Sequence, residues 1–476
     1  MPNFFVMCCL LMSSSINVDR QTLRELIKLA YPMVVSQGAF ALMIFTDRYF
    51  MSLISPTHMA ASLGGGVAAY FCMSLFIGIL SYGNALVAQY FGAGETAKCP
   101  RVVTQGLLLC LAFIPVLLAI GYAVGALFGW IGHEPGQVLL ERQYFYILLW
   151  GSGLSLAKTC LASYFAGIGR TRVVMIADTV GVALNIPLSY LLIFGVWGLP
   201  ELGIAGAAWG TIISTLFSLG LFLAFYLAPH HRRAFAVARS LVIDRGILRR
   251  YVRLGLPSGM EMFLNVAAFN LFLMMFQSYG VVEAASAAIV FNWDMLSFIP
   301  MIGLNVALIS LVGRFVGERD MTRLRGVVVA GFVIGLLYSS LLAVMFVLFS
   351  GPLVALFVAD PLLQLGHSTE PSIVALASFM MVGLATYVMA DATVLIAGGI
   401  LRGAGDTRWL MWASVAAHWV MLVMQYLVIK VFELGPRVSW VTFVLMVLSI
   451  AGLYLWRLKG PTWRTPEAFQ RVMDEH

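Results

Sequence analysis

Five acidic side chains lie inside long apolar segments of this 476-residue chain: Asp47, Asp178, Glu261, Asp294 and Asp391. An acid at the centre of a membrane-spanning helix costs about 2.5 to 3.5 kcal/mol, so such residues indicate a functional site. A carboxylate shielded from water can bind a proton or a cation and release it again. The chemistry expected here is therefore reversible ion binding.

Asp391 belongs to the segment ADATVLIAGGILRGAGDTRWLM, which ends in a glycine-broken basic turn. Asp391 precedes Arg402 by eleven residues, or about 16 Å along a helix. This distance places it near the middle of a bilayer core about 30 Å thick. In the turn, Gly403 and Gly405 permit a tight backbone, and Arg402 and Arg408 are expected to anchor it at the cytoplasmic face.

The composition is that of a membrane protein. Hydrophobic residues make up 61% of the chain and charged residues 11%, against about 45–50% and 25% in soluble domains. A short amphipathic helix is expected over Arg20 to Lys28. It is followed by twelve apolar segments long enough to cross a bilayer: 29–53, 64–91, 102–128, 143–166, 173–196, 204–228, 254–279, 286–313, 327–350, 374–400, 409–432 and 438–457. An even number of spans puts both termini on one side.

The basic residues identify that side. Of 29 Lys and Arg residues, 24 fall in the termini and in the loops on the same side, and 3 fall in the opposite loops. Both termini are therefore expected in the cytoplasm, with the protein multi-pass in the plasma (inner) membrane. Because the net charge of +7 is spread over short turns, it predicts topology and no nucleic-acid partner. Inside the spans, Arg48 is expected to extend outward and Lys158 to pair with an acid across the bundle.

The chain repeats itself across a basic segment. KLAYP, beginning at Lys28, and RLGLP, beginning at Arg253, lie 225 positions apart, and VAQYFGAG and VGRFVGER repeat at the same offset. Because both halves start on one side, the repeat is parallel about an axis normal to the membrane. The expected division is an N-terminal cytoplasmic segment, a six-helix lobe, a basic linker, a second six-helix lobe and a cytoplasmic tail: 1–28, 29–228, 229–253, 254–457 and 458–476.

Two turns carry a family resemblance. LRGAGDTR, and its counterpart GIGRTR in the first half, resemble turns of the multidrug and toxic compound extrusion (MATE) transporters, with features of the prokaryotic NorM-like branch. The resemblance runs from about Arg20 to Lys459. It implies an all-α membrane protein with twelve transmembrane helices in two pseudo-symmetric six-helix bundles around a central cavity. It also implies a secondary antiporter that exports organic, mainly cationic compounds in exchange for Na⁺ or H⁺ by alternating access.

The resemblance assigns ion-coupling roles in the first half. Asp47 occupies the position of the first-helix aspartate, and Asn185 and Thr211 match positions that help to bind the ion. Ser189 departs from one branch, which has a second acid there. If sodium is the coupling ion, the metal ligands implied are Asp47, Asn185 and, in the second half, Asp391.

In the second half, Asp391 matches the tenth-helix aspartate of the NorM-like branch. That branch has a glutamate where this chain has Asn265, and here the acid comes one turn earlier, at Glu261. Glu261 and Asp391 are therefore also expected to couple the ion, as a shifted pair. The candidate substrate-binding residues are Asp391, Glu261, Asp294 and Asn265. For Glu261 and Asp294, hydrogen bonding between packed helices remains the alternative.

Other functions are less well supported. The sequence has no nucleotide-binding or hydrolase motif, so a cofactor-free transporter driven by an ion gradient is expected. The partners expected are membrane lipids and small organic cations, with the chain a monomer. The alternatives are a lipid-linked oligosaccharide flippase and, from another class, a membrane-embedded enzyme. His418 is expected to be a packed histidine, and the opening MPNFFVMCCLLMSSS to be disordered or absent from the mature protein rather than a cleaved signal.

The charge asymmetry makes the orientation testable. Single cysteines in the segment from Gly351 to Pro371 should react with an impermeant thiol reagent added to intact cells. Cysteines placed between Pro229 and Arg253 should react only after the cells are opened. Labelling of the cysteines between Pro229 and Arg253 in intact cells would contradict this orientation.

Overall fold

The computed structural model describes residues 20–130, 134–358 and 370–474. Within these ranges, twelve helical segments are long and apolar enough to cross a membrane, as the sequence predicts. The long helices are α2 (Arg20–Ile54), α3 (Pro56–Ser81), α4 (Gly83–Gly92), α5 (Cys99–Leu127), α6 (Pro135–Gly167), α7 (Thr171–Phe194), α8 (Ile204–Leu227), α10 (Arg245–Gln277), α11 (Val281–Glu318), α12 (Met321–Leu348), α14 (Glu370–Gly403), α15 (Thr407–Tyr426) and α16 (Pro436–Lys459). The prediction for the opening residues lies outside the described ranges.

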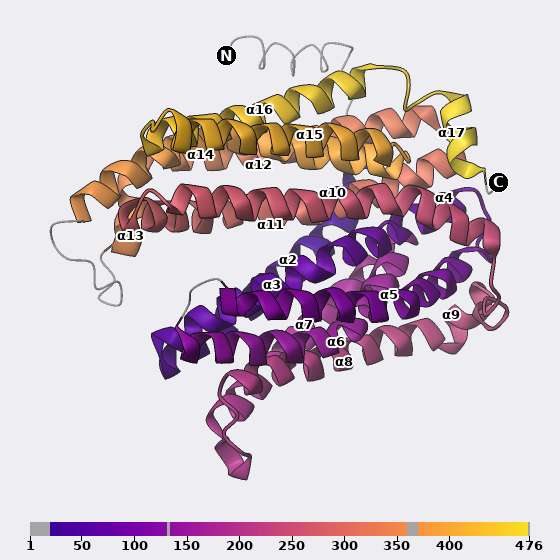
Figure 1. Cartoon of the computed structure of the whole chain (residues 1–476). Helices are drawn as coiled ribbons and strands as arrows, with labels where there is room; N and C mark the ends of the chain where they lie inside the picture. The colour runs from indigo at the N-terminus through magenta and orange to yellow at the C-terminus, as the bar shows by residue number, and fades with distance from the viewer. Residues whose placement is uncertain (1–19, 131–133, 359–369, 475–476) are drawn as a thin grey trace.

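Short elements lie between these helices or, for α17, after the last of them. They are η1 (Phe128–Trp130), η2 (Val196–Gly198), α9 (Pro229–Ala234), η3 (Val237–Arg239), α13 (Ser350–Val358), η4 (Leu427–Val431) and α17 (Pro466–Met473). Figure 1 shows α9 and α17 at one end, here called the basic end, and α13 at the opposite end. Helices α13 and α17 were not predicted from the sequence.

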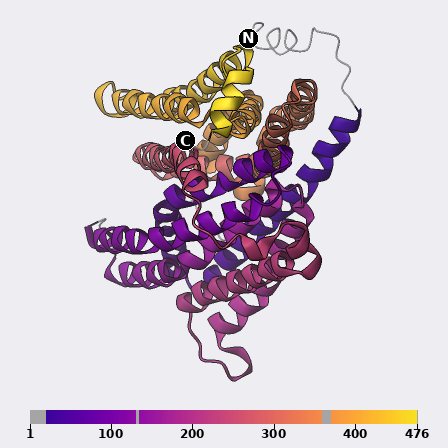
Figure 2. The ribbon, with the colours of Figure 1, turned by 90° about the vertical axis from the view of Figure 1, so that its right-hand side faces the viewer.

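The long helices form two groups. In Figure 1 the first helix group, α2–α8 in indigo to magenta, lies below the second helix group, α10–α16 in rose to yellow. Figure 2 shows the same arrangement from the basic end. Helix α10 packs on α3, and α11 packs on α2 and α4, so α10 and α11 form the second group's side of the contact.

Helix α2 differs from its prediction. The sequence suggests a short helix over Arg20 to Lys28 before the first span, but the structure has one continuous helix. Its first turns are held in place by the second helix group, because Leu26 and Ala30 are buried in that group's core and Glu25 pairs with Arg323 of α12 at 3.1 Å.

The predicted span 64–91 is divided between α3 and α4 at Tyr82. Tyr251 of α10 reaches this break, where its hydroxyl donates a 2.7 Å hydrogen bond to the Leu80 carbonyl oxygen. A side chain at Gly83 would collide with the Tyr251 ring, since a Cβ there would lie 2.5 Å from the hydroxyl oxygen. The break therefore results from a tyrosine inserted beside the helical hydrogen-bond ladder.

The two groups touch closely where α3 packs on α10 and α2 packs on α11. A Cβ at Gly78 of α3 would lie 2.7 Å from the Gly259 Cα of α10, and one at Gly303 of α11 would lie 2.6 Å from the Val34 nitrogen. Small residues let helix backbones approach closely within a membrane. The contact between the groups therefore depends on glycine at these positions.

Three side chains add hydrogen bonds across the contact. The amide of Asn84 donates to the Val306 carbonyl at 3.1 Å, the amide of Gln89 donates to the Gly403 carbonyl at 2.8 Å, and the Ser310 hydroxyl donates to the Ala166 carbonyl. Gln89 also accepts a 2.5 Å hydrogen bond from Arg250, a residue only 1% exposed whose guanidinium lies over the Tyr90 ring. The basic end is thus fastened by buried polar groups as well as by packing.

Helix α17 lies against this contact. Its Phe469 is buried in the core of the second group, whereas Val472 packs beside the core of the first group. The Met473 sulfur accepts from Arg250 at 3.3 Å, and the Asp474 carbonyl accepts from Arg253 at 2.7 Å. The predicted tail therefore contains a helix that contacts both groups.

The basic segment docks on the first group through His231 of α9. The His231 Nε2 lies 2.9 Å from the Tyr164 hydroxyl, and Nδ1 lies 3.1 Å from an Arg170 nitrogen. Because arginine can only donate, Nδ1 must accept, and the imidazole is neutral with its proton on Nε2. Burial, with the neighbouring Arg170 charge, lowers the pKa of His231 to about 4.

This docking should weaken in acid. Since the folded pKa of His231 lies below the ordinary value of about 6.5, the stability it contributes is complete above pH 6.5 and is lost as the pH falls towards 4. The melting temperature of His231→Ala should lie below that of the wild type at pH 7.5, and the difference should shrink by pH 4.5. His230→Ala, at the exposed neighbour, is the matched control. A difference independent of pH would contradict the neutral, docked imidazole.

Candidate functional site

Asp47 lies in a buried polar cluster of the first group. Its side chain is 7% exposed, and its Oδ2 accepts a hydrogen bond from Thr211 of α8 at 3.3 Å. Its other oxygen, Oδ1, has no hydrogen-bond partner among the described residues. Arg48, the next residue, is exposed. The two neighbours thus face opposite ways, as the sequence predicts.

Helix α7 supplies the other side of this cluster. Asn185 and Ser189 are one turn apart and fully buried, and Ser189 lies beside the Asp47 carboxylate. The Asn185 amide makes no hydrogen bond of acceptable geometry through either its nitrogen or its oxygen within the described structure. The same is true of the Ser189 hydroxyl. Buried polar groups are normally satisfied. A bound ion or water would satisfy these groups.

The donor set fits a hard cation. Carboxylate, amide and hydroxyl oxygens are the ligands that such ions prefer, and Asp47, Asn185, Ser189 and Thr211 offer one or more each. No three His, Cys, Asp or Glu side chains lie close enough to hold a metal ion together in the part of the chain that the structure describes. With one carboxylate among these oxygen ligands, the site can balance the charge of a monovalent cation or bind a proton.

Asp178, near the basic side of the same group, is already paired. The Lys158 ammonium lies 2.9 Å from its Oδ1, and the Ser36 hydroxyl donates to its Oδ2 at 2.5 Å. The prediction that Lys158 pairs with an acid is thereby confirmed. Because its charge is compensated, Asp178 is not free to bind an ion.

Glu261 of α10 is also paired, but not as the sequence suggests. Its carboxylate, 3% exposed, lies 2.7 Å from the Arg402 guanidinium and accepts from the Tyr454 hydroxyl at 3.4 Å. The expected pairing of Glu261 with Asp391 is wrong, since Asp391 interacts with Asp294 instead. Arg402 is likewise not the surface anchor predicted for it, because it turns inward to the buried acid.

Asp294 of α11 and Asp391 of α14 form the second unpaired cluster. Both are partly buried, and their carboxylates are close enough for their charges to interact. Tyr387 lies one turn before Asp391, next to both acids, and Ser297 donates to Asp294 at 3.0 Å. Two neighbouring carboxylates repel each other. A proton or cation between them would relieve that repulsion.

Asn265 and His418 contribute differently from these acids. The Asn265 amide donates to the Ser414 hydroxyl at 2.7 Å, which ties α10 to α15. His418 Nδ1 lies 2.8 Å from the Ser414 carbonyl on its own helix. The sequence analysis missed Tyr387 and Ser414, although Tyr387 lies four positions before Asp391 and so on the same helix face.

Comparison with known proteins gives the following matches. A profile of the MatE family matches residues 32–191 and 257–427. The chain is 27% identical over 445 residues to the multidrug resistance protein MdtK of Proteus mirabilis (strain HI4320). The aligned residues cover 91% of this chain and 95% of that protein.

Solved structures match the fold. One is described as the outward-facing conformation of a multidrug resistance MATE family transporter of the MOP superfamily. It has a TM-score of 0.81 at 20% identity, over 95% of this chain and 97% of that chain. Another, a MOP superfamily transporter from Pyrococcus furiosus Vc1 (DSM3638), has a TM-score of 0.81 at 20% identity over 93% and 97%.

The Glu261–Arg402 pair should be a strong determinant of stability. Removing one partner of a buried ion pair costs about 3 to 5 kcal/mol of stability. Because the Arg402 side chain is 23% exposed, we expect a cost towards the lower end of this range. Glu261→Gln should lower the melting temperature of the purified protein, and the double variant with Arg402→Gln should recover part of the loss. Glu318→Gln, which removes a partly exposed acid paired with Arg314 at 2.8 Å and with Arg323 at 3.7 Å, should cost about 1 kcal/mol or less. Equal effects of Glu261→Gln and Glu318→Gln would contradict the buried pair.

Proposed function

Because the chain belongs to the MatE family, we propose that it is an antiporter that exports organic, mainly cationic compounds in exchange for Na⁺ or H⁺. Family membership identifies a transporter rather than an enzyme. The relative from Proteus mirabilis is described as a multidrug resistance protein. That description supports small organic molecules as the exported substrates of this chain.

The distribution of charge among the five intramembrane acids carries this proposal. Two are neutralised by basic partners, Asp178 by Lys158 and Glu261 by Arg402. The other three, Asp47, Asp294 and Asp391, form no ion pair among the described residues. These three give each helix group a polar acidic cluster that has no basic partner among the described residues. Such clusters favour cations and disfavour the lipid-linked phosphates that a flippase would carry.

The two clusters suit different tasks. The Asp47 cluster has one carboxylate with two hydroxyl groups beside it and the Asn185 amide one turn away on α7, and it suits the coupling ion. The Asp294–Asp391 cluster has two acids and the aromatic ring of Tyr387, which suit an organic cation. We propose that Asp47, Asn185, Thr211 and Ser189 hold Na⁺ or a proton. Asp391 and Asp294 then bind the substrate or exchange it for an ion.

Transport requires the ion to change the balance between two conformations, since an ion that binds both equally shifts neither. We propose that residues 29–228 and 254–457 rock against each other as lobes. The basic end faces the cytoplasm, as the positive-inside rule favours. Since the hydrogen bonds between the groups lie near this end, the conformation described is closed to the cytoplasm. Both termini then lie in the cytoplasm and the protein spans the plasma (inner) membrane.

The division of tasks can be tested with ethidium efflux from vesicles under Na⁺ and pH gradients imposed separately. Asp391→Asn should abolish efflux and weaken equilibrium ethidium binding about tenfold or more, equivalent to at least about 1.4 kcal/mol. Asp47→Asn should keep part of the binding but lose its dependence on the ion. Glu95→Gln, at an exposed acid paired with Lys98, is the control and should transport normally.

A different outcome would contradict each part of this proposal. Normal export by well-inserted Asp391→Asn would remove this residue from the substrate site. Normal ion-dependent release of ethidium from Asp47→Asn would remove the first-group cluster from coupling. Wild-type efflux that responds to neither gradient would refute antiport itself.

A further inference from the structure

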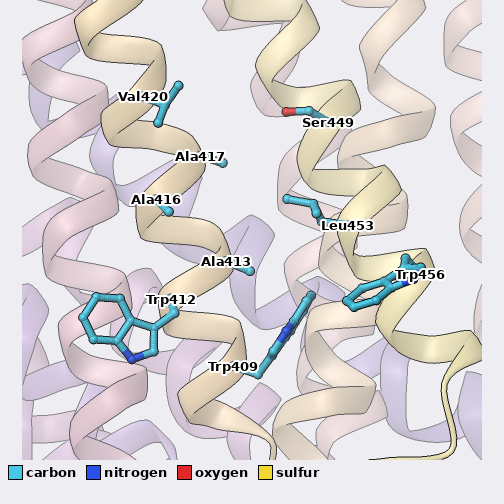
Figure 3. A pocket seen from close by; sticks show the side chains of 9 residues that line it. All are labelled: Trp409, Trp412, Ala413, Ala416, Ala417, Val420, Ser449, Leu453 and Trp456. Carbon is cyan, nitrogen blue, oxygen red and sulfur yellow. The ribbon is translucent and has the colours of Figure 1, made fainter.

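A groove of about 500 Å³ lies between α15 and α16 on the outer surface of the second helix group. Figure 3 shows three tryptophans at its end nearest the basic turn, Trp409 and Trp412 from α15 and Trp456 from α16. Trp412 is 69% exposed and Trp456 is 66% exposed. The groove is therefore open to the surroundings and is separate from both acid clusters.

The floor of the groove is apolar and made of small residues. Ala413, Ala416 and Ala417 leave the space that larger side chains would fill, as Figure 3 shows. From Trp409 to Val420 the groove follows eleven residues of α15, or about 16 Å. That length is close to half of a hydrocarbon core about 30 Å thick. The groove therefore has the length of one leaflet's acyl chain.

Positive charge surrounds the tryptophan end. Arg408 directly precedes Trp409, and Lys459 lies one turn after Trp456; both are exposed and neither forms an ion pair among the described residues. Arg457 differs, because Asp406 neutralises it at 2.7 Å and its guanidinium lies over the Trp409 ring. Two uncompensated cations thus lie just beyond the aromatic rim, at the depth where tryptophans meet lipid headgroups.

We propose that this groove binds an anionic phospholipid from the leaflet at the basic end. One acyl chain lies along the alanines, the tryptophan rings contact the glycerol region, and the phosphate lies between Arg408 and Lys459. The charge of the rim selects the occupant. An organic cation would be repelled by the two basic side chains, and a second copy of this chain would bring its own uncompensated cations to them.

The test is native mass spectrometry of the purified full chain with equal amounts of phosphatidylglycerol and phosphatidylcholine. The wild type should bind phosphatidylglycerol preferentially. Near an anionic lipid, each Lys or Arg contributes roughly fivefold in affinity, so Arg408→Gln with Lys459→Gln should reduce the preference about 30-fold. Arg172→Gln is the matched control, because Arg172 is exposed at the second position of α7 as Arg408 is in α15.

A second variant tests the groove itself. Ala416→Phe should weaken binding of both lipids without changing the headgroup preference, and Ala112→Phe, at an exposed position of α5, should change neither. An unaltered preference in the double variant would overturn the headgroup assignment. Unaltered lipid binding by Ala416→Phe would overturn the acyl-chain site. A wild-type dimer that Ala416→Phe converts to monomer would show that a second copy occupies the groove and would also overturn the proposal.

Discussion

The high cost of charge in a membrane governs the structure of this transporter. An acid or base inside the bilayer must be neutralised by a partner or retained for a function. Lys158 compensates Asp178 and Arg402 compensates Glu261, at 2.9 Å and 2.7 Å. The remaining acids gather in two clusters, one in each helix group. The same constraint therefore stabilises the helix packing and leaves three of the five carboxylates without a basic partner among the described residues.

The two groups use this constraint differently. Around Asp47, hydroxyl groups from α7 and α8 lie beside a single acid, and several polar atoms of this cluster lack hydrogen-bond partners in the described structure. Around Asp391, a second acid and a tyrosine take their place. Although the two halves of the sequence repeat each other, their two acidic clusters contain different side chains. The repeat preserves the helix framework, while the side chains facing the interior have diverged.

Much of the fold follows from hydropathy, because each span is long and apolar enough to be recognised alone. The contact between Thr211 and Asp47 was expected only through family resemblance, and the structure brings the two side chains together. The Glu261–Arg402 pair could not be inferred, because an arginine in the last turn of a membrane-spanning helix normally anchors at the surface and nothing local shows that it turns inward. The continuous α2 was missed for a similar reason, since its first turns are held by residues almost 300 positions later.

The hydrogen bonds made by Asn84, Gln89 and Ser310 to carbonyl oxygens of the other group set an energetic threshold for conformational change. Each contributes about 0.5 to 1.5 kcal/mol net when water can replace it, so the three together contribute about 3 kcal/mol. One elementary charge crossing a potential of 100 mV releases about 2.3 kcal/mol. The three hydrogen bonds alone are thus similar in size to the free energy that one or two charges release in crossing such a potential.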